Sequence, residues 1–267
     1  MKSEVESERL IAEVSTISSR AEAASNRVVI SQPMYFPWIG ILEQVRLASE
    51  FVHYEDVQFS KGGFSNRVQV KTKKCMRWLT VPLRNHSLGQ KINEVEVDYR
   101  TDWQTSHRDI LRQAYAESEH RADMLDLVDC VFSHAYQSLA ELSKASMMSL
   151  IRYFGLEEGR SFIDSPELGI AGSSSQRVID ICSRLKASRY VTGHGAKNYL
   201  DHKAFEAQGI EVDYIEYGLH PYNQLHGPFT PYVTALDLVA NCGKDGAQHI
   251  TGKQIHWRKF IAMQNEN

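Results

Sequence analysis

The chain has 267 residues and a formal net charge of −3, so it is long enough to bury a sizeable core and lacks the basic surplus typical of nucleic-acid-binding proteins. Apolar residues make up 42% and charged residues 24% of the chain, as in ordinary soluble globular proteins. No apolar run approaches the roughly 18 residues that a membrane-spanning helix needs. We therefore expect neither a nucleic-acid partner nor a membrane span.

Residues 1–27 form a polar N-terminal extension with a weak apolar stripe at the spacing of one helix face. We interpret it either as one amphipathic helix, docked on the protein or on the second subunit of a homodimer, or as a partly ordered extension. It lacks the apolar core of a signal peptide, and the cysteines lack zinc-ligand spacing. We therefore expect a cytoplasmic protein with no metal and with reduced, mostly buried thiols, at Cys75, Cys130, Cys182 and Cys242.

The body, residues 28–267, is interpreted as a single α/β domain that begins with a buried strand. Val28 to Ile30 is a continuous apolar run, which is typical of a strand covered on both faces. A helix is predicted from about Ile39, and "EFVHYEDVQF" is predicted to contain a second strand. A strand–helix–strand unit favours two parallel strands.

The middle of the chain changes from strands to helices. "NRVQVKT" and "RWLTVPL" predict an antiparallel pair joined at "KKCM", and "NEVEVDY" alternates as a further short strand would. Residues 103–155 carry three successive apolar stripes of helical spacing, and Gly155 is suited to end the third helix. We therefore expect a helical insertion at about residues 103–155.

The last third returns to alternating strands and helices. "RYVTG" and "IEVDYIEY" predict strands, "AKNYLDHKAFEAQG" predicts a helix that ends at Gly209, and a further helix is predicted over about 232–241. The whole pattern predicts a parallel, Rossmann-like α/β core with a helical middle section. We expect Val28–Ser31 and Tyr190–Thr192 to be neighbouring strands, because each runs into a glycine-bearing turn before a helix.

The first candidate site is the stiff loop "QPMYFPWIG", which follows the first strand. Ligands of open parallel sheets bind beyond the carboxyl ends of the strands. Gln32 is suited to hydrogen-bond a base or sugar, and Gly40 allows close backbone approach where helix N–H groups attract phosphate. Tyr35 and Trp38 would shape the wall of the site. The alternative is that Tyr35, Phe36 and Trp38 only plug the end of the core.

The second candidate site follows the second strand, in "HYEDVQFSKGGFSNRVQVK". Arg67 and Lys71 point to one face of a strand, where two cations hold a phosphate or carboxylate. Asp56 lies at the same edge of the sheet, and His53 is a candidate base. The alternative is a solvated surface strand on which Asp56 pairs with Arg67.

The third candidate site is the turn in "YVTGHGAKNYLD", where a strand passes through two glycines into a helix. Such a turn is typical of phosphate binding. His194 is a candidate for acid–base chemistry or phosphate contact. Lys197, Asn198 and Tyr199 are candidate binding residues. The alternative for His194 is a turn histidine with a purely structural role.

The fourth candidate is the loop "HPYNQLHGPFTP", which crowds His220, Gln224 and His226. No Asp or Glu stands at ligand spacing, so we do not expect a metal site. A lid over a polar ligand is the favoured interpretation.

These segments together resemble the WbqC-like protein family. The resemblance rests on "QPMYFPWIG", "VHYEDVQFSKGGFSNRVQVK", "WLTVPL", "YVTGHGAKNYLD", "GIEVDYIEY" and "FTPYVTALDLVANCG", and it extends from Val28 to Gly243. Members are often encoded among polysaccharide and natural-product biosynthesis genes. The resemblance therefore implies an acyl or aminoacyl transfer to an amino sugar or related amine.

A more distant similarity links the first loop and "GHGAKNYL" to pantothenate synthetase and the HIGH-type nucleotidylyl-transferase fold. In that group the first loop is rich in histidine and a lysine of the second turn meets the nucleotide. Here the first loop reads "YFPWIG" and Asn198 follows Lys197. The similarity implies a nucleotide-binding shape, whereas the histidines of the first loop are missing here.

The residues and the resemblance predict a transferase or ligase that joins an acyl or aminoacyl group to the amine of a small or nucleotide-linked substrate. Lys197 and Arg67 would neutralise phosphate, and His194 or His53 would deprotonate the amine. The donor, and with it any nucleotide cofactor, stays open. The alternative is a non-catalytic subunit that binds a nucleotide sugar or an acyl carrier protein, for which "KTKKCMR" supplies a basic surface.

Overall fold

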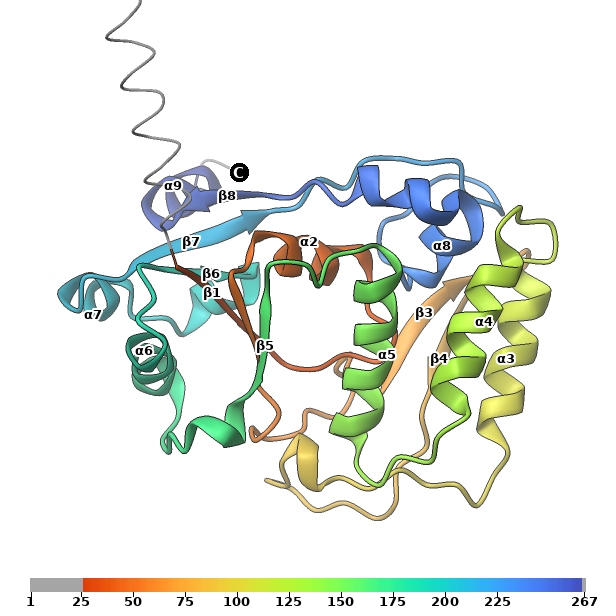
Figure 1. Ribbon diagram of the computed structural model, residues 1–267, viewed down its shortest axis with the longest axis horizontal. Helices are drawn as coiled ribbons and strands as arrows, with labels where there is room; N and C mark the ends of the chain where they lie inside the picture. The colour runs from red at the N-terminus through yellow and green to blue at the C-terminus, as the bar shows by residue number, and fades with distance from the viewer. Residues whose placement is uncertain (1–25, 266–267) are drawn as a thin grey trace, which may run out of the picture.

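The computed structural model describes residues 26–265, and the helix predicted in the N-terminal extension lies outside them. Its main sheet has the strand order β5-β2-β1-β6-β7-β8 (Figure 1). Neighbouring strands are parallel except for β8, which runs antiparallel to β7 at one edge. The strands are β1 (Arg27–Ser31), β2 (Glu50–His53), β5 (Ser161–Asp164), β6 (Arg189–Thr192), β7 (Glu211–Glu216) and β8 (Lys253–His256).

The strand order reverses at β1. From β1 the chain first adds β2 and β5 on one side, and it then crosses over to add β6 and β7 on the other. Val28 pairs with Tyr190 and Val29 with Val191, so the prediction that these segments are neighbouring strands is confirmed. In sheets of this Rossmann-like kind, ligands bind beyond the carboxyl ends of the strands where the order reverses. This point lies between β1 and β6.

Both faces of the sheet are covered, which explains the continuous apolar run of β1. Val28 and Ile30 pack with α6 (Ser174–Arg184), α7 (His202–Ala207) and α9 (Trp257–Asn265) on one face. Val29 lies in the other core, which includes α2 (Ile39–Leu47). Successive side chains of a strand point to opposite faces, so a strand buried on both sides needs apolar residues throughout.

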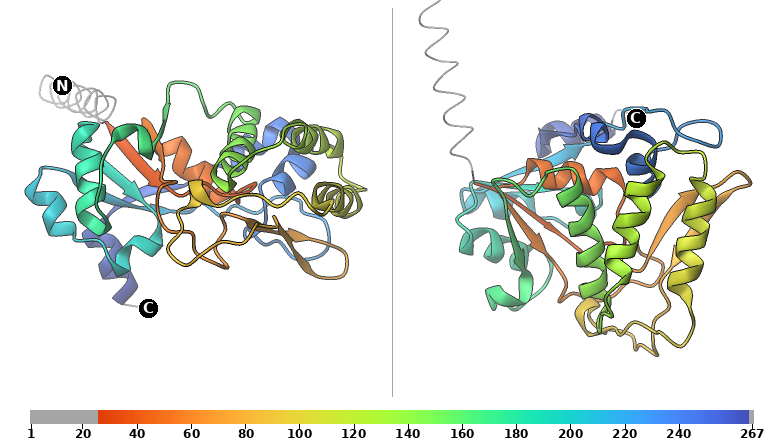
Figure 2. Two further views of the ribbon diagram at one scale, coloured as in Figure 1. Left: turned by 90° about the horizontal axis from the view of Figure 1, so that it is seen from below. Right: turned by 45° about the vertical axis from the view of Figure 1, so that its right-hand side comes forward.

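The remaining elements enlarge the core on the α2 side. The predicted antiparallel pair and the three helices predicted over 103–155 are confirmed. They lie together in the half of the molecule away from α6 and α7 (Figure 2). These elements are β3 (Arg67–Lys71), β4 (Met76–Thr80), α3 (Trp103–Ala114), α4 (Arg121–Phe132), α5 (Leu139–Tyr153) and α8 (Leu236–Cys242). Elsewhere along the described residues the chain forms 3-10 turns, at Ile92–Glu94, Ser165–Leu168, His194–Asn198 and Gly243–His249.

Three sequence-based expectations for these elements are wrong in detail. "NEVEVDY" forms the 3-10 turn Ile92–Glu94 and isolated bridges instead of a strand. The helix predicted to end at Gly209 breaks into a 3-10 turn and α7, because the Asp201 side chain accepts the Ala204 N–H at 3.1 Å and starts a new helix. The helix predicted from residue 232 begins only at Leu236.

The cysteines also differ from expectation. Cys182 is buried, but Cys75 and Cys130 are exposed and Cys242 is half-buried, so the prediction of mostly buried thiols is wrong. In the described residues, no group of three or more His, Cys, Asp and Glu side chains could hold a metal ion. None of the helices in the described part of the chain has both the length and the apolar content to cross a membrane.

Candidate functional site

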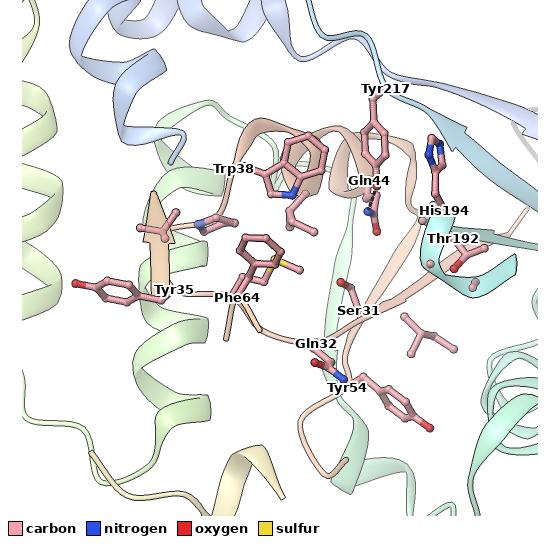
Figure 3. A pocket seen from close by; sticks show the side chains of 18 of the residues that line it. Ser31, Gln32, Tyr35, Trp38, Gln44, Tyr54, Phe64, Thr192, His194 and Tyr217 are labelled. Carbon is pink, nitrogen blue, oxygen red and sulfur yellow. Dashed lines mark hydrogen bonds between the residues drawn. The ribbon is translucent and has the colours of Figure 1, made fainter. Parts of the chain in front are cut away.

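A cavity of about 750 Å³ lies where the sheet order reverses (Figure 3). This volume is in the range of small-molecule binding sites. Ser31 and Thr192, the last residues of β1 and β6, line it. Tyr54 and Tyr217 directly follow β2 and β7 and line it as well. Four parallel strands therefore place side chains around one space, as the topology requires.

The stiff first loop forms one wall of this cavity and is held by hydrogen bonds from distant segments. Phe36 has a positive φ of 37°, a conformation that is costly for a residue other than glycine. Its N–H donates to Ser146 Oγ of α5 at 2.9 Å, and its carbonyl accepts the Thr234 hydroxyl at 2.8 Å. The Ala235 N–H donates to the Pro37 carbonyl at 2.7 Å. The start of α8 and one face of α5 thus fix the loop.

The aromatic residues of the loop divide between the core and the cavity. Phe36 is fully buried in the core. Tyr35 is also fully buried, and its hydroxyl turns away from the cavity to lie 3.0 Å from His107 Nδ1, although its ring contributes to the wall (Figure 3). Trp38 is half-buried and faces the cavity. A Cβ at Gly40 would lie 2.3 Å from the Trp38 indole, so this glycine makes room for the indole.

Tyr217 brings a hydroxyl donor to the cavity. Gln44 Nε2 of α2 donates to the Tyr217 hydroxyl oxygen at 3.0 Å, and the rings of Trp38 and Tyr217 are 4.8 Å apart. Burial raises the pKa of Tyr217 to about 12, so the hydroxyl keeps its proton at neutral pH. Glu43 of α2 fixes the next residue by accepting the Gly218 N–H at 3.1 Å.

Arg67 supplies positive charge to the cavity. Among the described residues that line this space, it is the only Lys or Arg, and there is no Asp or Glu. Its Cζ lies 4.2 Å from the centroid of the Trp78 ring, and its Nη2 donates to the Gly62 carbonyl. Asp56 is therefore not its partner, contrary to the alternative drawn from the sequence. The lining favours an anionic ligand.

His194 has an orientation suited to a base. Its Nε2 lies 2.7 Å from the Ile215 carbonyl oxygen, and a carbonyl only accepts, so Nε2 carries the proton. A neutral His194 then has its free lone pair on Nδ1. The ring packs against Tyr217 at 5.1 Å and Phe260 at 4.9 Å, and these contacts hold it at the cavity wall.

The larger cavity thus unites Gln32, Tyr35, Trp38, Arg67, His194 and Tyr199. Two other predicted residues from the same turn do not line it. Lys197 is exposed, and its Nζ donates to Gln264 Oε1 at 3.4 Å. Asn198 is exposed on the same 3-10 turn. The residues at the start of this turn, His194 to Ala196, line the cavity together with Tyr199 that follows the turn, whereas the two residues between them do not.

Lys71 and the loop of residues 218–231 form a separate polar cluster. Lys71 Nζ is buried and donates to Gln224 Oε1 at 2.9 Å and to the Gly227 and Pro228 carbonyls at 3.0 and 2.6 Å. His226 Nε2 lies 2.6 Å from the Ala114 carbonyl oxygen, and His220 is exposed. These contacts tie the loop to β3 and α3, so His220, Gln224 and His226 do not form a lid over the cavity.

His53 and Asp56 lie at the end of β2 in a third polar region outside the cavity. The His53 ring is 5.3 Å from Phe51 and 6.1 Å from Phe162. Asp56 accepts hydrogen bonds from Ser165 and Arg177. Burial raises the pKa of Asp56, but these hydrogen bonds outweigh it and hold the pKa below its usual value. Asp56 is therefore held in an ion pair with Arg177, and neither side chain lines the cavity.

We expect His53 to destabilise the fold as the pH drops from 6.5 towards 4. Burial lowers its pKa to about 4, and Lys144 lowers it further while Asp164 acts in the opposite direction. The unfolded chain then takes up a proton that the folded chain refuses. Through His53 alone, the free energy of unfolding is therefore about 2 kcal/mol lower at pH 5 than above pH 6.5.

The His53→Phe variant tests this expectation, because the ring already lies beside Phe51 and Phe162. Urea unfolding of both proteins at pH 7 and pH 5 gives the two pH dependences. Burial raises the pKa of the carboxyls at Glu43, Glu55 and Asp237, which stabilises the fold as the pH falls. These groups are common to both proteins, so the difference isolates His53. Equal slopes in the two proteins would contradict the expectation.

The sequence reasoning missed several residues that line the cavity. Tyr54 and Tyr217 each directly follow a predicted strand, and this position at the carboxyl end could have identified them as lining residues. Gln44, Phe64 and Tyr232 had no comparable signal, because their place in the cavity depends on how α2, the turn before β3 and the segment before α8 pack.

Comparisons with known proteins identify relatives but no characterised activity. The chain is 30% identical over 227 residues to "Uncharacterized protein Rv1507c" of Mycobacterium tuberculosis (strain ATCC 25618 / H37Rv), a match that covers 84% of this chain and 97% of the relative. No solved structure matches the chain. The model of the WbqC-like protein family matches residues 32–249, which include every residue that lines the cavity except Ile30 and Ser31. The chain therefore belongs to the WbqC-like protein family.

Proposed function

We propose that the protein transfers an acyl or aminoacyl group to the amine of a small or nucleotide-linked substrate, such as a nucleotide-linked amino sugar. The observation that carries this proposal is the position of His194 on the wall of the cavity, with its ring held by Ile215 and its lone pair on Nδ1. A fixed imidazole beside a cavity of this size is suited to general base catalysis.

The lining supports a nucleotide-linked acceptor. Exposed or half-buried aromatic rings, among them Trp38, Tyr199 and Tyr232, offer flat surfaces on which a base can stack. Arg67 offers a planar cation to phosphate, and Gln32 offers an amide to a base or sugar. Together they hold the ligand by charge, stacking and hydrogen bonds.

The reaction then follows from the position of the base. The nitrogen of the amine attacks the acyl carbonyl carbon, and its proton passes to His194 Nδ1. The bond between the carbonyl carbon and the leaving group breaks, and its electron pair departs with the leaving group. His194 returns the proton to that group. The Tyr217 hydroxyl, protonated at neutral pH, is suited to donate a hydrogen bond to a substrate oxygen.

Turnover with purified components tests this proposal. The protein is incubated with a nucleotide-linked amino sugar and a panel of acyl and aminoacyl donors, and the amide product is measured by mass spectrometry. We expect a mass gain equal to one acyl group, and none with the corresponding sugar that lacks the amine. Ligand binding without product for any donor would count against catalysis.

We expect Arg67 to hold the phosphate of such a ligand. A charge-assisted hydrogen bond contributes roughly 1.5–3 kcal/mol, so Arg67→Met should weaken nucleotide binding about ten- to a hundredfold in calorimetry. The same measurement on Lys197→Ala decides between the two candidate cations, because Lys197 is exposed and lies outside the cavity lining. A strong loss with Lys197→Ala and none with Arg67→Met would assign the phosphate to Lys197.

The surface of the β3–β4 hairpin favours a second candidate function, the binding of an acyl carrier protein. Trp78 and Phe64 are 38% and 51% exposed and their rings lie 6.0 Å apart, and the exposed Lys73 and Lys74 lie at the turn between β3 and β4. Phe64 also lines the cavity. An acidic carrier that docks here would have its acyl group near the cavity mouth. Binding of the carrier without turnover would favour this candidate over catalysis.

A further inference from the structure

A second, smaller cavity of about 300 Å³ adjoins the first. Both cavities share Trp38, His194, Tyr217 and Tyr232 as lining residues. Trp38 and Tyr217 are in ring contact, and Figure 3 shows them with His194 at one end of the larger cavity. These residues therefore form a partition, and His194, the proposed base, stands between two spaces.

The two spaces differ in chemistry. The larger contains Arg67 and several glutamine side chains. The smaller is lined mainly by apolar side chains from β7, β8, α9 and the residues after β7. Its apolar residues are Ile215, Leu219, Ile255, Phe260 and Met263. Polar atoms of a nucleotide would lose hydrogen bonds to water there, whereas a hydrocarbon chain gains by leaving water.

We propose that the smaller cavity binds the apolar acyl chain of the donor, while the larger one binds the acceptor. This inference rests on the proposed acyl transfer and specifies its donor. A water-sized group takes about 30 Å³, so 300 Å³ holds roughly ten non-hydrogen atoms. The donor is therefore a medium-length acyl group whose carbonyl carbon reaches the partition at His194. Trp38 and Tyr217 separate its chain from the acceptor.

One charged side chain at this cavity indicates which chemical form of the donor binds there. Glu216 is exposed and lines the smaller cavity. Its carboxylate would repel the carboxylate of a free fatty acid. The neutral carbonyl of a thioester or ester meets no such repulsion, so we expect the activated acyl group to bind better than the free acid.

Calorimetry with N-acetylcysteamine thioesters of acetate, butyrate, hexanoate, octanoate and hexadecanoate tests the inference. Each methylene that is fully buried should strengthen binding about fourfold. We expect affinity to rise from acetyl to octanoyl and to stop rising before hexadecanoyl, because the space is filled. Free octanoate should bind more weakly than its thioester. An affinity that is independent of chain length would overturn the inference.

A substitution that fills the smaller cavity, compared with a matched control elsewhere, tests whether the acyl chain binds there. Met263 lines the smaller cavity and is 42% exposed on α9, so Met263→Trp should occupy the space without disturbing the core. Met76 is 39% exposed on β4 and lines neither cavity, so Met76→Trp is the control. We expect at least a tenfold loss of octanoyl thioester binding in Met263→Trp alone. Equal binding by the two variants would overturn the assignment.

The outcomes of these binding experiments distinguish the acyl cavity from the proposed catalysis. Chain-length-dependent binding that Met263→Trp abolishes, without amide formation, would support the acyl cavity and count against catalysis. If amide forms at a rate that depends neither on the chain length nor on Met263→Trp, the result would support catalysis and overturn the assignment of the smaller cavity to the acyl chain. Uridine diphosphate serves as the probe of the larger cavity, and its affinity should be the same in both methionine variants.

Discussion

Replacing His194 with glutamine is expected to lower kcat of amide formation by about a hundred- to ten-thousandfold, the usual contribution of a general base. Glutamine retains an N–H that can donate to the Ile215 carbonyl, so the local fold has a replacement for the contact that His194 makes. Its amide nitrogen has no lone pair that takes up a proton at neutral pH. The loss should appear in kcat, and the free energy of unfolding should change by less than about 1 kcal/mol.

The matched control for this experiment is His202→Gln. His202 is a half-buried histidine of α7 whose Nε2 lies 2.8 Å from the Tyr214 hydroxyl, and it lines neither cavity. We expect it to leave the rate of amide formation unchanged. A rate for His194→Gln within threefold of the unsubstituted protein would remove His194 as the base. His53 would not replace it, since its ring lies outside the cavity between aromatic side chains.

The parallel sheet could be predicted because its central strands are buried on both faces and are followed by amphipathic helices. The two edge strands were not predicted from the sequence. Ser161–Asp164 and Lys253–His256 are only four residues long, and none of their side chains is fully buried. Short, partly solvated edge strands carry little hydrophobic pattern, and the hydrogen bonds that define them come from β2 and β7, which are distant in sequence.

The place of the candidate site was predictable, because carboxyl ends of parallel strands meet at one edge of a sheet. The role of each charged residue was not. Arg67 and Lys71 stand four positions apart on β3, yet one lines the cavity and the other is buried among carbonyls of residues 227 and 228. Only the packing of the loop before α8 separates them, and that packing depends on a contact with Gln224, 153 positions away.

Asp237→Ala is expected to destabilise the fold by about 3–5 kcal/mol, since it removes the shared acceptor of a buried polar cluster. The Asp237 side chain is 1% exposed. It accepts hydrogen bonds from the Tyr222 and Tyr115 hydroxyls at 2.7 and 3.0 Å and from Gln224 Nε2 at 2.9 Å. Without the carboxylate, these donors stay buried with no equivalent acceptor, and the space of the lost side chain adds a cavity.

Urea unfolding measures this loss, and Tyr115→Phe is its matched control, because it removes one donor and leaves the acceptor satisfied by the others. We expect Tyr115→Phe to cost about 1 kcal/mol. Gln224 also accepts from Lys71 Nζ, so Asp237 secures the loop whose two ends hold Tyr217 and Tyr232 at the cavity. Asp237→Ala should therefore weaken uridine diphosphate binding as well, whereas His194→Gln should reduce turnover at unchanged stability. Equal stability of Asp237→Ala and Tyr115→Phe would show that the cluster does not anchor the loop.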